Sequence, residues 1–201
     1  ATKVTLGTNM EATITLTVGD KTYETADASG VVYVAEGAVV EASESSGAAA
    51  KNRIDVTTGE NGTPVAGTPA TSASGATATE TVGSEELTFT QVKYVAAITL
   101  ANVTLTAGQA APTAMTLSTT GVKSSAALTK IKGTVDQSGM VANGEWEFSV
   151  EIEADTGYYF DADTALTDTA LTTGGWTMAS ADPTVSADGA SITTSFSKTL
   201  S

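Results

Sequence analysis

Residues 144–160 read GEWEFSVEIEADTGYYF, and this stretch decides the fold of the second half of the chain. Apolar side chains occupy every second position from Trp146 to Ala154, and mainly carboxylates fill the positions between them. A period of two places successive side chains on opposite faces of a strand, whereas a helix would spread both kinds around its circumference. The stretch therefore predicts a strand with one face in a core and a row of carboxylates in water.

Shorter segments with the same alternation recur along the 201-residue chain, separated by turn signals rich in Gly, Asp, Asn and Pro. Such spacing is typical of antiparallel sandwiches, and no segment has a convincing helical period. We therefore expect an all-β protein of two antiparallel β-sandwich domains, residues 1–94 and 95–201. Residues 59–75 predict a long exposed loop in the first domain, residues 161–175 a polar loop in the second. A change of phase at Asn102 predicts a bulge or a crossover between sheets.

The charge of the chain limits its partners. Nine Lys and Arg stand against 23 Asp and Glu, which gives a formal net charge of −14. Nucleic acids and anionic membrane surfaces both require clustered basic residues, and no apolar run approaches the length of a membrane span. We therefore predict no nucleic-acid partner and no membrane insertion, and we interpret the acidity as a solvated surface.

The residue types that carry most enzymatic chemistry are missing. The chain has no Cys and no His, which removes disulfides, thiol chemistry, imidazole bases and the usual zinc ligands. Glycosidases need two carboxylates in one cleft, whereas the carboxylates of 144–160 alternate on a face predicted to lie in water. We expect no catalytic residues and no enzymatic activity.

Two kinds of small site remain open. Asp155, Asp161, Asp163 and Asp168 lie close together in the sequence, and calcium takes carboxylate and carbonyl oxygens, so calcium is the candidate ligand. The alternative is that they are ordinary polar turn residues, and no other cofactor is indicated. Asn61 and Asn102 each begin an N-glycosylation acceptor pattern, the alternative being chance matches in a Thr-rich chain.

The second half resembles a known family. The residues that carry the resemblance are the opening strand 98–105, the turn 108–112, the block Gly144-x-x-x-Phe148 through Gly157-Tyr158-x-Phe160, and the closing hairpin and strand at 188–199. In these, the chain is similar to the bacterial immunoglobulin-like repeats of Gram-positive secreted and surface-layer-associated proteins. The resemblance implies immunoglobulin-like sandwiches in an extracellular, cell-envelope setting, with roles in structure, adhesion or module spacing. It brings no catalytic residues.

The first residues suggest how copies could join. Val4 and Leu6 alternate with polar residues near the N-terminus, and open sandwiches expose strand edges that accept a strand from a neighbour. Residues 1–8 are therefore a candidate donated strand, the alternative being the ordinary first strand of their own sheet. Head-to-tail donation does not close on itself and builds a filament.

The chain begins Ala-Thr-Lys without Met, as a chain does after removal of a signal peptide. We therefore expect an extracellular structural protein of the cell surface that forms a homo-oligomer or homopolymer, as a filament or surface layer. The alternative function is an adhesin or a module that binds cell-envelope glycans, with aromatic side chains such as Tyr158, Tyr159 or Trp176 exposed on a flat platform.

Overall fold

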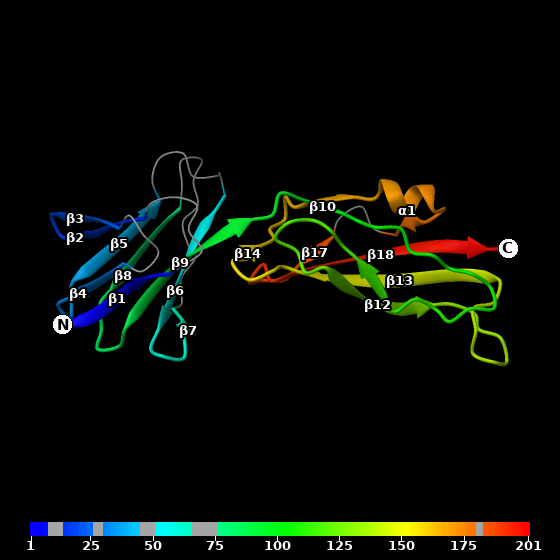
Figure 1. Cartoon of the computed structure of the whole chain (residues 1–201), viewed down its shortest axis with the longest axis horizontal. Coiled ribbons are helices and arrows are strands. Elements are labelled where there is room, and N and C mark those ends of the chain that lie inside the picture. The colour runs from blue at the N-terminus through cyan, green and yellow to red at the C-terminus, as the bar shows by residue number, and fades with distance from the viewer. Residues whose placement is uncertain (8–13, 26–29, 45–50, 66–75, 180–182) are drawn as a thin grey trace. The chain divides into compact units, whose positions relative to one another are not determined.

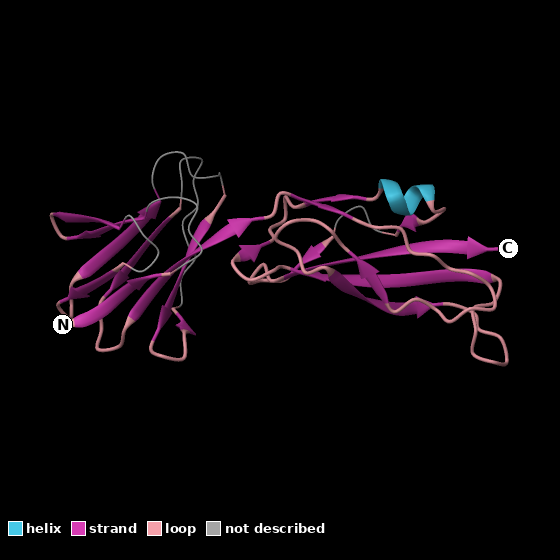
Figure 2. Cartoon of the chain, viewed as in Figure 1, coloured by secondary structure: helices cyan, strands magenta, loops and turns pink. Residues whose placement is uncertain are grey.

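A computed structural model describes residues 1–7, 14–25, 30–44, 51–65, 76–179 and 183–201 (Figure 1). The chain divides into two compact units, Ala1–Tyr94 and Val95–Ser201. Strands make up nearly all the regular structure, with one helix of five residues in the described part (Figure 2). The protein is all-β, as the alternation predicts. In the described ranges no helix has the length and apolar character needed to cross a membrane.

The first unit contains two sheets. One has the order β4-β1-β9-β6-β7, in which β1 pairs antiparallel with β4 and parallel with β9. The other has the order β3-β2-β5-β8 and is antiparallel throughout. The strands are β1 Thr2–Leu6, β2 Ile14–Val18, β3 Lys21–Thr25, β4 Val31–Val34, β5 Val39–Glu44, β6 Arg53–Thr58, β7 Thr63–Pro64, β8 Thr77–Thr81 and β9 Leu87–Tyr94.

A single aliphatic core lies between these two sheets. The alternating residues of each strand that point inward are buried, so the arrangement is sandwich-like. Its fully buried side chains include Leu6, Ile14, Leu16, Ile54 and Phe89. The predicted loop 59–75 begins differently from the expectation, because Thr63 and Pro64 pair back onto β6 across a tight turn; residues 66–75 lie outside the described part.

The second unit is built on one main sheet of order β11-β12-β13-β18-β16, with β17 also pairing with β18. A separate parallel pair joins β10 and β15. The elements are β10 Ala97–Thr99, β11 Ala114–Thr116, β12 Ser125–Lys132, β13 Gly144–Glu153, β14 Tyr158–Tyr159, β15 Ala165–Thr167, α1 Thr169–Thr173, β16 Thr177–Met178, β17 Thr184–Val185 and β18 Ser191–Leu200. Strands β13 and β18 pair along ten residues each and are the longest strands of the unit.

Strand β13 has the two faces that the sequence predicts. Trp146, Phe148, Val150 and Ile152 are at most 1% exposed, and the residues between them point outward. Two of the outward carboxylates also form ion pairs: Glu145 pairs with Lys132, and Glu153 pairs with Lys123. The row of carboxylates is thus partly neutralised by lysines from neighbouring segments.

Two local predictions for the second unit are wrong. Residues 161–175 are not simply a polar loop, because they contain β15 and the helix α1, whose Leu171 is 1% exposed. The helix has a single buried residue in five, which is too few to show a period. The phase change at Asn102 marks neither a bulge nor a crossover between strands, because β10 ends at Thr99 and residues 100–105 form no strand. Val103 and Leu105 are nevertheless buried.

Candidate functional site

The N-terminal strand β1 occupies an internal position in its sheet. Val4 and Leu6 are fully buried in the first unit's core. Val4 stands opposite Val32 of β4 on one side and Leu87 of β9 on the other. In this chain β1 therefore serves as a strand of its own sheet, which is the alternative that the sequence left open.

Contacts along β1 tie it to segments far away in the sequence. Thr2 Oγ1 donates to the Gly83 carbonyl at 2.7 Å, and Lys3 Nζ lies 3.1 Å from a Glu86 carboxylate oxygen. The Gly7 amide donates to the Phe89 carbonyl at 2.6 Å. A Cβ at Gly7 would lie 2.7 Å from Thr90 Oγ1, so glycine allows this close approach.

The position of β1 has a structural consequence. β1 is the strand that joins β4 to the rest of the sheet, since β4 pairs with no other strand in the described part of the chain. Without β1, the space between β4 and β9 would be lined by unpaired backbone groups and by the apolar surface that Val4 and Leu6 cover. The same strand from a second copy could fill this space with identical contacts.

Three of the four predicted calcium ligands, Asp155, Asp161 and Asp168, accept hydrogen bonds from residues close by in the sequence. Asp155 Oδ1 accepts from the Thr156 amide at 2.8 Å, and Asp161 Oδ1 accepts from the Asp163 amide at 2.7 Å. Asp168 precedes α1 and accepts from Thr172 Oγ1 at 3.4 Å. Among the described residues, which include all four aspartates, no three carboxylates come close enough to hold a metal ion. Nearness in sequence does not bring these side chains together in space.

The two glycosylation candidates are both accessible. Asn61 lies in the turn between β6 and β7, and Asn102 lies in the irregular segment after β10. Both side chains are exposed. Asn102 also touches the backbone of Gly174, where a Cβ would collide with its amide. Attachment of a glycan at either position stays a prediction.

The predicted aromatic platform does not form, because Tyr159 and Trp176 are buried and Tyr158 is half-buried against the core. Trp176 is 2% exposed and its Nε1 donates to the Val103 carbonyl at 2.8 Å, while Tyr159 is 6% exposed. These rings belong to the core because it needs large side chains to fill it. The exposed aromatic residues lie instead in the first unit, where Tyr33 is 69% and Tyr23 40% exposed. The run Val31-Val32-Tyr33-Val34 is apolar throughout, so its pattern did not reveal which side faces outward.

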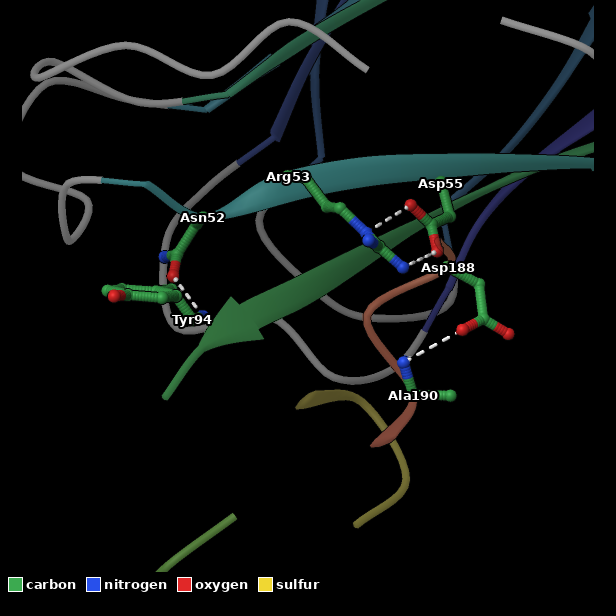
Figure 3. A network of polar contacts seen from close by, with 6 residues as sticks. All are labelled: Asn52, Arg53, Asp55, Tyr94, Asp188 and Ala190. Carbon is green, nitrogen blue, oxygen red and sulfur yellow. Dashed lines mark hydrogen bonds and ion pairs between the residues drawn. The ribbon is translucent and has the colours of Figure 1, made fainter. Parts of the chain in front are cut away.

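Polar side chains in the first unit are arranged for structure. The buried Glu44 carboxylate accepts from the Ala76 amide at 2.9 Å and from Gln91 Nε2. Asn52 Oδ1 accepts from the Tyr94 amide at 3.3 Å (Figure 3). Arg53 and Asp55 form a two-point ion pair on neighbouring outward positions of β6, with Nε–Oδ1 2.8 Å and Nη2–Oδ2 3.1 Å. These contacts give no paired acid and base.

The outer face of the sheet β3-β2-β5-β8 carries a shallow depression lined by Thr17, Val39, Glu41 and Thr79, among others. It holds one carboxylate, Glu41, whose oxygens accept from Ser43 Oγ and Thr79 Oγ1 at 3.4 Å each. A single carboxylate held by hydroxyls lacks the partner that acid–base hydrolysis needs.

Comparison with protein-family models, with curated proteins and with solved structures finds no match for this chain in any of the three. Among the candidate sites described above, the position of β1 between β4 and β9 is the one with the most fully defined contacts.

Proposed function

We propose that this chain is a non-enzymatic extracellular structural protein whose two units are immunoglobulin-like sandwiches, and that copies join into a filament or surface layer by exchanging β1. The observation that carries the proposal is the position of β1: it is internal to its sheet, it pairs with β4 on one side and β9 on the other, and it buries Val4 and Leu6 completely.

Exchange of β1 between copies requires no new contact surface, because it reuses contacts that each chain already makes. The exchanged strand makes the same hydrogen bonds to β4 and β9 and buries the same side chains as it does in its own chain. Burial of Val4 and Leu6 is worth about 1.5–3 kcal/mol per side chain in either arrangement. Because these contacts are the same in both arrangements, the balance between a closed monomer and an exchanged polymer depends on protein concentration.

Two further features support a structural role. The outward positions of β18 are all Ser or Thr, which suits a hydrated surface, and the carboxylates of the adjacent β13 are partly paired with lysines. The extracellular setting rests on the resemblance of residues 98–199 to surface-layer-associated repeats.

A pair of introduced cysteines tests the exchange. Thr5 stands opposite Val31, and the Leu6 amide donates to the Gly30 carbonyl at 3.0 Å, so Thr5 and Val31 form a pair without mutual hydrogen bonds. Such pairs have Cα atoms about 4.5 Å apart, which is within disulfide range. The chain has no cysteine of its own, so Thr5→Cys/Val31→Cys supplies the only thiols.

We expect the doubly substituted protein, when assembled under reducing conditions and then oxidised, to give a ladder of disulfide-linked multimers on a non-reducing gel. Oxidation before assembly should lock β1 in its own chain and abolish filaments in electron micrographs until reductant is added. A mixture of the two single variants is the matched control and should give dimers only. Filaments that yield only internally crosslinked monomers would show that β1 is not exchanged. Dispersed monomers at high concentration would show that the protein forms no filament.

A further inference from the structure

The outer edge of β4 is the second feature that suits contact between copies. Among the strands that the structure describes, β4 is the last of its sheet, and two of its four side chains are exposed, Val31 at 43% and Tyr33 at 69%. Tyr33 has the largest exposed fraction among the large apolar side chains that the structure describes. An uncovered strand edge of this kind is a template for pairing with another strand.

The backbone of β4 points its remaining hydrogen-bonding groups toward this edge. The bond from the Leu6 amide to the Gly30 carbonyl fixes the antiparallel pattern, in which alternate residues of β4 bond to β1. Residues 30, 32 and 34 face β1, so the N–H and C=O groups of Val31 and Tyr33 point the other way. The two residues with exposed side chains are thus also the two that present donors and acceptors at the edge.

The other edges of the first unit carry protective residues that β4 lacks. Strand β3 contains Lys21, β8 contains Glu80, and β7 consists of two residues including Pro64. Charged side chains and proline at an edge oppose pairing with another strand. β4 reads VVYV, with neither a charge nor a proline.

Charge also favours this edge for contact with a second copy. The whole chain carries −14, so most surfaces of two copies repel each other. Beside Tyr33 on the adjacent strand lies Lys3, and its charge is balanced by Glu86 at 3.1 Å. Two copies can therefore bring their β4 edges together without opposing like charges.

We propose that β4 pairs antiparallel with β4 of a second copy about a two-fold axis centred on Val32. This register places Val31 of each copy opposite Tyr33 of the other, and it aligns their outward N–H and C=O groups for hydrogen bonding. The pair of an aromatic and a β-branched side chain is a favourable cross-strand combination. The two sheets become continuous across the contact.

A contact of one short strand is weak by itself and gains strength by repetition. In this respect the inference deepens the proposed function: exchange of β1 joins copies head to tail, whereas β4 pairing joins neighbouring filaments side by side. The isolated chain should show the same contact as a weak, concentration-dependent dimer.

The substitution Tyr33→Lys tests the contact against a matched control, Tyr23→Lys, which makes the same change at an exposed tyrosine of the edge strand β3. We expect sedimentation equilibrium of the full chain to show a dimer that Tyr33→Lys weakens at least tenfold and Tyr23→Lys does not. In electron micrographs, Tyr33→Lys should leave single filaments in place of paired ones or sheets. Equal association of the two variants would overturn the proposal.

Amide hydrogen exchange followed by NMR tests the register directly. On raising the concentration, the amides of Val31 and Tyr33 should become protected, while those of Val32 and Val34 are protected already. Continued rapid exchange at both Val31 and Tyr33 in the dimer would also overturn the proposal.

The two proposals fail separately. If the disulfide ladder is absent but dimers that depend on Tyr33 still form, the β1 exchange proposal is wrong and the β4 pairing proposal stands. If the Tyr33→Lys protein gives a normal disulfide ladder and its filaments associate side by side as before, the β4 pairing proposal is wrong and the β1 exchange proposal stands.

Discussion

The two units solve the same packing problem with different side chains. In the first unit the described core is aliphatic apart from Phe89, and the N-terminal strand closes it. The core of the second unit adds a cluster of rings to its aliphatic residues, with Trp146, Trp176, Phe148 and Phe196 on and around the long β13–β18 pair. The two cores are thus completed differently: the first by one five-residue strand, and the second by a cluster of rings on and around a pair of ten-residue strands.

The largest expected effect comes from removing a ring of the second core. Trp176 meets Phe196 edge-to-face with centroids 5.0 Å apart and Phe148 at 5.8 Å, and its Nε1 donates to Val103. We expect Trp176→Ala to cost the second unit about 3–5 kcal/mol of unfolding free energy. Both tryptophans of the chain lie in this unit, so fluorescence of Trp146 during urea unfolding reports on it alone.

Trp176→Phe is the matched control for that change. It keeps a ring in the cluster and loses only the indole hydrogen bond, so its loss of stability should be smaller. A Trp176→Ala protein that unfolds at the same urea concentration as the wild type would contradict the view that the aromatic cluster holds the second unit together.

The second prediction concerns the strand that closes the first unit. Leu6 is fully buried, and Leu6→Ala should lower the unfolding free energy of the first unit by about 2–5 kcal/mol, followed by circular dichroism, with the fluorescence transition unchanged. Because the exchanged strand loses the same contact, the proportion of exchanged material should change little. The rate of exchange should rise, because β1 leaves its own sheet more readily.

Leu16→Ala supplies the comparison, since Leu16 is equally buried in the same core but lies on β2. A similar loss of stability with a smaller gain in exchange rate is expected. Equal acceleration by both variants would mean that exchange requires unfolding of the whole unit and that β1 is not a separable strand.

Sequence reasoning predicted the elements whose pattern is long and regular. Strand β13 carries an unbroken alternation, and both its faces follow from it. The inward direction of Val4 and Leu6 follows from the same rule. The partners of β1 could not be predicted, because its parallel pairing with β9 joins segments about eighty residues apart and leaves no local signal.

The remaining misses have equally physical causes. The apolar run of β4 is compatible with either face pointing outward, so the exposure of Tyr33 appears only when β1 and β4 are paired. The helix α1 is a single short turn in a Thr-rich segment and has no period to detect. The aspartates at 155–168 are close in sequence, but Asp155, Asp161 and Asp168 accept local hydrogen bonds, and no three carboxylates among the described residues come together as a cation site.

A smaller effect should come from glycines that lie against rings of the second core. A Cβ at Gly133 would collide with the ring of the fully buried Trp146, which has no space to move away. Gly133→Ala should therefore lower the unfolding free energy of the second unit by about 1–3 kcal/mol, measured by Trp fluorescence. Gly83 of the first unit meets nothing within 4 Å, so Gly83→Ala should change stability by less than about 0.5 kcal/mol. Equal effects of the two changes would contradict the close packing inferred around Trp146.

The smallest effect concerns the surface ion pair between Lys123 and Glu153 in the second unit. The side-chain hydrogen bond to Glu153, and then its charge, raise the pKa of Lys123 above its ordinary 10.5. Since the raised pKa belongs to the folded state, the stabilising contribution is complete below the unfolded pKa and is lost as pH rises through the folded one. The contribution is small because Lys123 is fully exposed and water screens the pair.

NMR titration of the Lys123 side chain should show the raised pKa in wild type and a lower one in Glu153→Gln. The stability difference between the two proteins should be constant at neutral pH and should shrink as the pH rises through the folded-state pKa of Lys123. A difference that disappears between pH 5 and 8 would show that another group governs it, since lysine and glutamate side chains ordinarily titrate outside that range.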